Sequence, residues 1–220
     1  MNVEKNGELM YMLKKLRHLI KDYLFVLKHG KFVEFHSFPF DTNQKLPNGA
    51  EKVMEKCCNI IKKLGVDYRL TDGTILGLYR DGDFIPHDND IDIDIIGDTK
   101  VKDIERNFTK LGMKLGRKVI YKGKVQQFIY YTSEHIIIDI VVWWQKNNFI
   151  YNCCERNYKR KQDIKFFDID NLDVIEFKGN KYPMPTPIEE WLEIRYGKDW
   201  RIPKTYKGDW KEECFDMKRV

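Results

Sequence analysis

The chain has 220 residues, a formal net charge of +5 from 39 Lys and Arg against 34 Asp and Glu, and 42% hydrophobic residues. This length suits one domain, or one domain with a small appendage, and the composition is globular rather than disordered. The mild positive charge fits a surface that meets nucleotides, phosphorylated glycans or acidic lipid. It is not the concentrated basic face of a nucleic-acid binder, so we expect no nucleic-acid partner.

The amino terminus predicts a basic amphipathic helix. Leu and Ile recur at helical spacing over residues 9–27, with Lys, Arg and His between them. Such a helix packs on the domain or lies on an anionic membrane, and the sequence leaves both open. Residues 31–49 read as a loop, because Pro39, Pro47 and Asn48-Gly49 interrupt any regular element. We therefore divide the chain into an amino-terminal helix and loop, residues 1–49, and one domain, residues 50–220.

The rest of the chain alternates helices and strands in an order typical of an α+β fold. The spacing of apolar residues and breakers predicts a helix over 50–64, a strand over 66–70, a brief helix over 74–79, a loop over 82–88, a strand over 90–96 and a helix over 101–111. Strands follow at 118–121, 126–132 and 136–144, then a mixed region over 149–183 with hairpins around Asn171 and Gly179-Asn180, and a helix over 187–196. We expect a mixed or antiparallel sheet with flanking helices.

The cysteines and the apolar runs indicate the compartment. Cys57-Cys58 and Cys153-Cys154 are adjacent pairs and Cys214 is alone, so the two-residue gap of common zinc sites is missing. We expect free buried thiols in a reducing environment. The first eight residues have no signal-peptide core, and no apolar run approaches the roughly 20 residues that a spanning helix needs. The expected location is cytoplasmic, with peripheral contact at the inner membrane face as an open alternative.

The most informative stretch is the acidic strand at 90–96. Residues two apart share a face of a strand, so Asp90, Asp92 and Asp94 line one face while the intervening isoleucines enter the core. Stacked carboxylates repel one another, and a divalent cation removes this penalty. Mg²⁺, which prefers oxygen ligands, is the expected cofactor, with Mn²⁺ as the alternative ion.

Two other interpretations of this stretch compete with a magnesium site. An EF-hand calcium loop is rejected, because Ile93 stands where Gly is needed and Thr99 where the bidentate Glu should be. A solvated acidic face on an edge strand remains open.

A second carboxylate lies within the buried-type strand IIIDIVV, at Asp139. A lone Asp in such a strand is costly to bury unless it is paired or binds a metal. If this strand neighbours the acidic one, Asp139 completes a metal site of three carboxylates. The alternative is an Asp bonded to backbone or to an Arg.

Three segments together resemble a known family. The stretch Asp72–Arg80, DGTILGLYR, followed by Gly82–Ile93, GDFIPHDNDIDI, closely resembles the signature of the LicD and fukutin-related phosphotransferases. The late segment Tyr196–Pro203, YGKDWRIP, is similar to the same family's carboxy-terminal motif. The resemblance spans about residues 66–205. In departure from the usual pattern, His87 replaces a Trp and Asn89 replaces an Asp.

The resemblance implies a nucleotidyltransferase fold like that of DNA polymerase beta. In that fold a glycine turn sits at the donor phosphates, a pair of aspartates holds the metal, and a later strand supplies a third carboxylate. The implied catalytic residues are Asp90, Asp92 and Asp139, and the implied metal ligands are these three with Asp88 in addition.

The implied substrate-binding residues surround the glycine turn. Gly73 lets backbone approach phosphate, and Thr74 adds a hydroxyl and caps the following helix. Arg80 is placed for a diphosphate, although an ion pair with a nearby Asp is as good an interpretation. Asp72 orients the turn or the acceptor, and His87 faces the acceptor or replaces a Trp in packing. Trp143 and Trp144 are either core residues or a surface that stacks on the base.

The function implied by the resemblance is Mg²⁺-dependent transfer of an alcohol phosphate, phosphocholine-like or a polyol phosphate. The donor would be CDP-activated, and the acceptor a hydroxyl of a cell-surface glycan or its lipid-linked precursor. Two alternatives stay open: ordinary nucleotidyl transfer, in which NMP moves from NTP to a small molecule or protein, and a degenerate member that only binds nucleotide.

Overall fold

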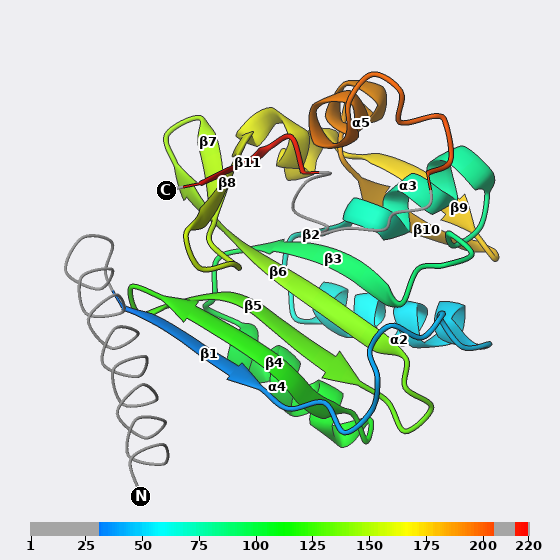
Figure 1. Cartoon of the computed structure of the whole chain (residues 1–220), viewed down its shortest axis with the longest axis vertical. Coiled ribbons are helices and arrows are strands. Elements are labelled where there is room, and N and C mark those ends of the chain that lie inside the picture. The colour runs from blue at the N-terminus through cyan, green and yellow to red at the C-terminus, as the bar shows by residue number, and fades with distance from the viewer. Residues whose placement is uncertain (1–30, 205–213, 220) are drawn as a thin grey trace, which may run out of the picture.

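A computed structural model describes residues 31–204 and 214–219 of the chain. The amphipathic helix expected over residues 9–27 lies outside the described residues. Figure 1 shows a curled sheet with helices packed around it. In the described part of the chain, no helix combines the length and the apolar character needed to cross a membrane.

The main sheet is mixed and centres on one long strand, β6. Its strands within the described residues are β1 (Phe32–His36), β2 (Tyr68–Leu70), β3 (Asp90–Ile96), β4 (Lys114–Tyr121), β5 (Lys124–Tyr131), β6 (Ile137–Lys146), β7 (Phe149–Asn152), β8 (Tyr158–Asp163) and β11 (Met217–Arg219). The order is β1-β4-β5-β6-β7-β8-β11, and β3 pairs with both β2 and β6. The β3–β6 pair is parallel and the other pairs are antiparallel.

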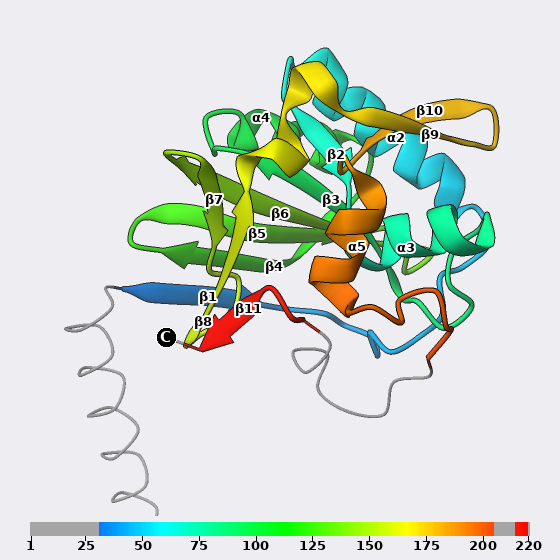
Figure 2. The same ribbon diagram turned by 90° about the horizontal axis from the view of Figure 1, so that it is seen from above.

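The helices and a small hairpin cover this sheet. They are α2 (Ala50–Lys63), α3 (Asp72–Asp81), α4 (Val101–Lys110), α5 (Ile188–Tyr196), the 3₁₀ turns η1 (Ile164–Phe167) and η2 (Ile169–Asn171), and the hairpin of β9 (Asp173–Phe177) and β10 (Asn180–Met184). Figures 1 and 2 show α2 and α4 together on one side of the sheet, whereas α3, α5 and the hairpin gather elsewhere, beyond β3.

The alternation along β3 separates core from site. Ile91, Ile93 and Ile95 are at most 1% exposed and belong to the same buried cluster as Met54 of α2 and Phe108 of α4. The aspartates between them must therefore point to the opposite face, because successive strand side chains alternate. The predicted division of this strand is confirmed, and so is the α+β class.

Several predicted elements need correction. The loop expected at 31–49 contains β1, which pairs antiparallel with β4, so the segment before residue 50 adds a strand to the sheet. Within 149–183, the hairpin at Gly179-Asn180 is confirmed, but the turn around Asn171 is a 3₁₀ turn and not a hairpin. The same region also contains β7 and β8, which the mixed sequence pattern did not reveal.

The five cysteines are all free, as expected. Burial is the largest influence on Cys57, Cys58 and Cys154, and it raises the pKa of each thiol. These thiols are therefore protonated packing groups at neutral pH.

Candidate active site

Three carboxylates from one short stretch converge. Asp90 and Asp92 lie on β3 and Asp88 lies in the loop just before it. One ligand atom from each of the three lies within 4.8 Å of the others. The strand period accounts for Asp90 and Asp92, but Asp88 reaches them only because its loop turns its side chain inward.

The start of α3 makes room for Asp88. A Cβ on Gly73 would lie 2.5 Å from Oδ2 of Asp88, closer than real side chains allow. The backbone of Asp88 is also fixed, since its carbonyl accepts a hydrogen bond of 2.8 Å from the Leu46 amide. A side chain at position 73 would therefore displace the carboxylate of Asp88, a constraint that the sequence motif does not reveal.

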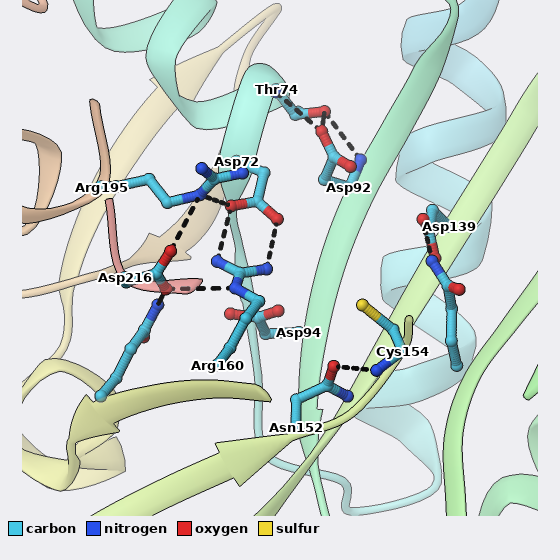
Figure 3. Close-up of polar contacts among 12 residues, drawn as sticks. Asp72, Thr74, Asp92, Asp94, Asp139, Asn152, Cys154, Arg160, Arg195 and Asp216 are labelled. Atoms are coloured by element: carbon cyan, nitrogen blue, oxygen red, sulfur yellow. Dashed lines mark hydrogen bonds and ion pairs between the residues drawn. The ribbon is translucent and has the colours of Figure 1, made fainter. Parts of the chain in front are cut away.

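Thr74 holds Asp92 in place (Figure 3). Its hydroxyl and its backbone amide donate to Oδ2 of Asp92 at 3.3 and 3.2 Å, and the hydroxyl accepts from the Asp92 amide at 2.7 Å. Thr74 is fully buried. Its hydroxyl is thus occupied by Asp92, and among the described residues no side-chain bond caps α3, in contrast to the cap expected from Thr74.

Asp139 lies beside the acidic strand, which is the condition that the sequence left open. In the parallel β3–β6 pair Asp92 is directly opposite Asp139. Oδ2 of Asp139 accepts a hydrogen bond of 2.6 Å from Nε2 of Gln127, and Oδ1 is buried without a hydrogen-bond partner among the described residues. Asp139 is not part of the three-residue cluster, so the structure places three of the four expected metal ligands together and the fourth on the adjacent strand.

Burial and mutual repulsion raise the pKa of these carboxyl groups. Burial raises the pKa of Asp88 to about 6, against a hydrogen bond from the Asn89 amide that lowers it. Burial, followed by the neighbouring carboxylates, raises the pKa of Asp90 and Asp92 well above the ordinary value. Burial raises the pKa of Asp139 to about 7, although Arg117 and Gln127 act to lower it. A cation would favour the ionised form of all four groups.

The cluster fits a hard divalent ion. Its donors are carboxylate oxygens, which Mg²⁺ prefers, and Oδ2 of Asp88 is buried without a hydrogen-bond partner among the described residues. An orphaned carboxylate oxygen beside two further carboxylates is costly unless a cation or a proton satisfies it. Asp88, Asp90 and Asp92 are therefore the residues that could hold a metal.

Asp94 shares the strand face of Asp90 and Asp92 but has a different partner. It is fully buried, and its Oδ2 accepts from Nε and NH2 of Arg69 at 3.0 and 2.8 Å. Arg69 is equally buried and lies over the ring of Phe167. Asp94 thus belongs to an internal ion pair and does not join the cluster, although its position in the alternation is equivalent.

Asp72 forms ion pairs with two arginines (Figure 3). NH1 and NH2 of Arg160 donate to its two oxygens at 2.9 and 3.0 Å, and Nε of Arg195 donates to Oδ1 at 2.7 Å. Nε of Arg160 also donates to Asp216 at 3.1 Å. Although burial acts to raise the pKa of Asp72, the two guanidinium groups hold it well below its usual range. Asp72 therefore links the start of α3 directly to β8 and α5, and through Arg160 to Asp216, the residue before β11.

Of the remaining residues that the sequence singled out, some line the cavity and others pack in the core. Arg80 donates to both oxygens of Asp81 at 2.9 and 2.7 Å, which is the ion-pair alternative. His87 is exposed and lines the cavity. Trp143 is fully buried, and the indole nitrogen of Trp144 donates to the Val125 carbonyl at 2.9 Å, so both pack as structural residues.

A cavity of about 1390 Å³ opens over these residues. Its walls include Asp72, Gly73, Arg80, His87, Asp88, Asp90, Asp92 and Asp139, together with residues that the sequence did not single out: Glu34, Arg117, Gln127, Arg160, Arg195 and Tyr196. Tyr196 could have been found, since it begins the carboxy-terminal motif. The others carry no local pattern, because four strands and α5, from distant parts of the chain, bring them together.

Comparison with known families matches the chain to a family model. The model described as LicD/FKTN/FKRP, nucleotidyltransferase domain, matches residues 65–187. The match includes β3, α3 and β6, and so every aspartate of the cluster and Asp139.

Curated relatives extend the likeness. "Ribitol-5-phosphate transferase FKTN" of Macaca fascicularis is 30% identical over 166 residues, which is 74% of this chain and 35% of the relative. The Homo sapiens protein of that name is 29% identical over the same shares. "Ribitol 5-phosphate transferase FKRP" of Homo sapiens is 25% identical over 63% of this chain and 29% of the relative. The chain spans about a third of the length of these relatives.

Solved structures give weaker likenesses. The lincosamide antibiotic adenylyltransferase LnuA, lincomycin-bound, has a TM-score of 0.48 at 13% identity and covers 68% of this chain and 86% of its own. A nucleotidyltransferase-like protein from Paracoccidioides brasiliensis has a TM-score of 0.43 at 14% identity over 70% of this chain and 69% of its own. The fold assignment rests on the strand order and the family model.

Proposed function

Because the chain belongs to the LicD/FKTN/FKRP nucleotidyltransferase-domain family, we propose that it transfers an alcohol phosphate from a CDP-activated donor to a hydroxyl of a glycan or glycan precursor. The observation that carries this proposal is the cluster of Asp88, Asp90 and Asp92 on the wall of a large cavity. Relatives named ribitol-5-phosphate transferases favour a polyol phosphate as the transferred group.

The proposed reaction is a displacement at phosphorus. The acceptor hydroxyl oxygen forms a bond to the phosphorus that carries the alcohol. The bond from this phosphorus to the bridging oxygen breaks, and CMP leaves with the electron pair. Such transfers depend on positioning and on charge neutralisation more than on covalent chemistry.

Each residue of the site has a proposed role in this step. Asp90 and Asp92 would hold Mg²⁺, or Mn²⁺ in its place, with Asp88 as a third ligand. When bound, the ion would neutralise the negative charge of the donor diphosphate. Asp139 accepts the acceptor's proton at Oδ1, which lacks another partner among the described residues. Thr74 keeps Asp92 directed at the cluster through its hydroxyl.

The test is product analysis with labelled CDP-ribitol, CDP-choline and CTP, each with a panel of glycan acceptors, with Mg²⁺ and with EDTA. We expect Mg²⁺-dependent release of CMP and transfer of the alcohol phosphate to the glycan. Release of pyrophosphate from CTP with transfer of CMP would instead indicate ordinary nucleotidyl transfer. Nucleotide binding by calorimetry without any turnover would indicate a binding-only protein, and either result contradicts the proposal.

A further inference from the structure

A row of polar side chains crosses four neighbouring strands and ends at Asp139. Nε of Arg117 on β4 donates to Glu34 on β1 at 2.6 Å. NH1 of Arg117 donates to Oε1 of Gln127 on β5 at 2.7 Å, and Nε2 of Gln127 donates to Oδ2 of Asp139 on β6 at 2.6 Å. All four residues line the same cavity.

The register of the sheet explains why these side chains meet. Gln127 is paired with Val141, and Ile129 is paired with Asp139, so Gln127 and Asp139 are diagonal neighbours. Diagonal neighbours in a sheet are about 7–8 Å apart, within reach of long side chains but not of short ones. A glutamine and an arginine can therefore bridge positions that two aspartates could not.

The hydrogen-bonding chemistry fixes the direction of the Gln127 amide. Arg has donors and no acceptor, so the group facing Arg117 must be the amide oxygen. An ionised carboxylate only accepts, so the group facing Asp139 must be the amide NH₂. Because Arg117 holds the oxygen, rotation of the amide by half a turn would break both contacts and place two oxygens against each other.

Arg117 itself is held from three sides. Beyond Glu34 and Gln127, its NH2 donates to Oε1 of Glu155 at 3.3 Å and to the Cys154 carbonyl at 3.2 Å. The Arg117 side chain is 14% exposed. It therefore lies in a fixed position before any substrate is bound.

Only one oxygen of the Asp139 carboxylate, at the end of the row, has a hydrogen-bond partner among the described residues. Gln127 occupies Oδ2 of Asp139, while Oδ1 is buried without a hydrogen-bond partner among residues 31–204 and 214–219. We propose that Arg117 and Gln127 are positioning residues, which fix the Asp139 carboxylate by one oxygen so that the other is presented to the reacting groups. This inference rests on the proposed function for the role of Asp139, and it adds β1 and β4 to the machinery of the site.

The first test is kinetic, with CDP-ribitol as donor in Mg²⁺. Gln127→Met removes both hydrogen bonds at similar length, and we expect kcat to fall about 10-fold or more, the scale on which residues that orient the side chains of a site contribute. KM for the donor should change less than about two-fold, because the lost interaction acts on the transition state. Arg117→Met should show the same pattern.

The matched control is Gln126→Met on the same strand. Gln126 is also buried, but its amide bonds to the backbone of Cys153 and Lys124 and not to Asp139. We expect its kcat to stay within about two-fold of the parent protein. Equal losses for Gln126→Met and Gln127→Met, or a change in KM alone, would overturn the positioning role.

The second test needs no substrate. In a ¹H–¹⁵N spectrum of the metal-free protein, the side-chain amide of Gln127 should be shifted and protected from exchange. Both features should be lost in Arg117→Met and in Asp139→Ala. A Gln127 amide that is unchanged in either variant would overturn the inference. Absence of turnover in the parent protein would contradict the proposed function and leave this second test intact.

Discussion

Equivalent aspartates of one strand have different roles. Asp90 and Asp92 belong to the cluster, whereas Asp94 pairs with the buried guanidinium of Arg69. Their spacing in the sequence is identical, so the difference comes from the elements that surround each carboxylate. A buried carboxylate needs a partner, and the partner available at each position decides what the residue does.

This difference predicts opposite phenotypes for the same substitution. Asp90→Asn and Asp92→Asn should stay folded and lose turnover by about 100-fold or more, since neutralisation of phosphate charge by a metal is worth several kcal/mol. The measurements are turnover and the Mg²⁺-induced shift in the unfolding temperature.

Asp94→Asn is the matched control for that prediction. It should keep the Mg²⁺-induced shift but unfold at a lower temperature, because Arg69 would lose its charged partner. Near-normal turnover in Asp90→Asn and Asp92→Asn would rule out the metal assignment.

The raised pKa values predict a pH dependence of stability. The pKa of Asp88 is about 6 and that of Asp139 about 7, against an ordinary value of 3.8. The folded protein therefore holds protons that the unfolded chain has released, so these groups lower stability as pH rises from about 4 to about 7. The depressed pKa of Asp72 acts in the other direction, but only in more acidic solution.

The unfolding temperature should accordingly be measured with EDTA and with Mg²⁺ across this range. We expect the stabilisation by Mg²⁺ to grow from about pH 5 to about pH 8. The carboxyl groups lose their protons over this range, and the ion binds only their ionised form. The growth should be smaller in Asp139→Asn. A Mg²⁺ effect that does not change with pH would contradict this assignment of the raised pKa values.

At the scale of elements, the start of α3 packs closely against the loop before β3, and the contact is made at Gly73. The space beside Gly73 is filled by the carboxylate of Asp88, and the following Thr74 holds Asp92. The start of α3 therefore helps to position the carboxylates of the cluster. Gly73 leaves space for Asp88, and Thr74 holds Asp92.

Gly73→Ala should consequently damage the site through Asp88. The added Cβ would lie 2.5 Å from Oδ2 of Asp88, so the carboxylate must move away. We expect turnover and Mg²⁺ affinity to fall about 10-fold, the scale of a disturbed ligand shell. In an Asp88→Ala background the same substitution should add little, and a full additional loss there would contradict this explanation.

At the scale of the whole molecule, segments beyond the matched domain complete the cavity. The family model covers residues 65–187, yet Glu34, Arg195 and Tyr196 also line the cavity. Asp216 reaches the same region, through Arg160 to Asp72 at the start of α3. Distant parts of the chain thus converge on one group of carboxylates and guanidinium groups.

Removing the carboxy-terminal anchor should destabilise the fold. The side chains of Asp216 and Arg160 are 1% and 2% exposed. Asp216→Ala leaves a buried guanidinium nitrogen and the amide of Gln162 without their acceptor. We expect the free energy of unfolding in urea to fall by about 3–5 kcal/mol, the usual cost of breaking a buried pair.

The control for this prediction is a pair at the surface. Lys165 and Glu190 form an ion pair with side chains 47% and 46% exposed. Exposed pairs contribute little, so Glu190→Ala should leave the urea midpoint nearly unchanged. A similarly small effect of Asp216→Ala would mean that the carboxy-terminal strand is not anchored as described.

The sequence by itself determined the elements whose patterns are local. The alternation of Asp and Ile gave β3 its two faces, and the IIIDIVV run placed Asp139 on a buried strand. The faces of β3 and the burial of the Asp139 strand follow from periodicity over a few residues. Gly73, Thr74 and Asp88 were implied as site residues by the resemblance of the DGT and HDND stretches to a family signature.

Only the tertiary structure decided which partners these residues meet. The parallel register of β3 and β6 set Asp92 beside Asp139, and diagonal contacts across antiparallel strands brought Gln127 to Asp139. Asp94 is buried beside Arg69 and pairs with it. The short strand β1 has no clear pattern of its own and is defined by its pairing with β4. Such contacts join residues far apart in the chain, and their energy depends on the surroundings rather than on local sequence.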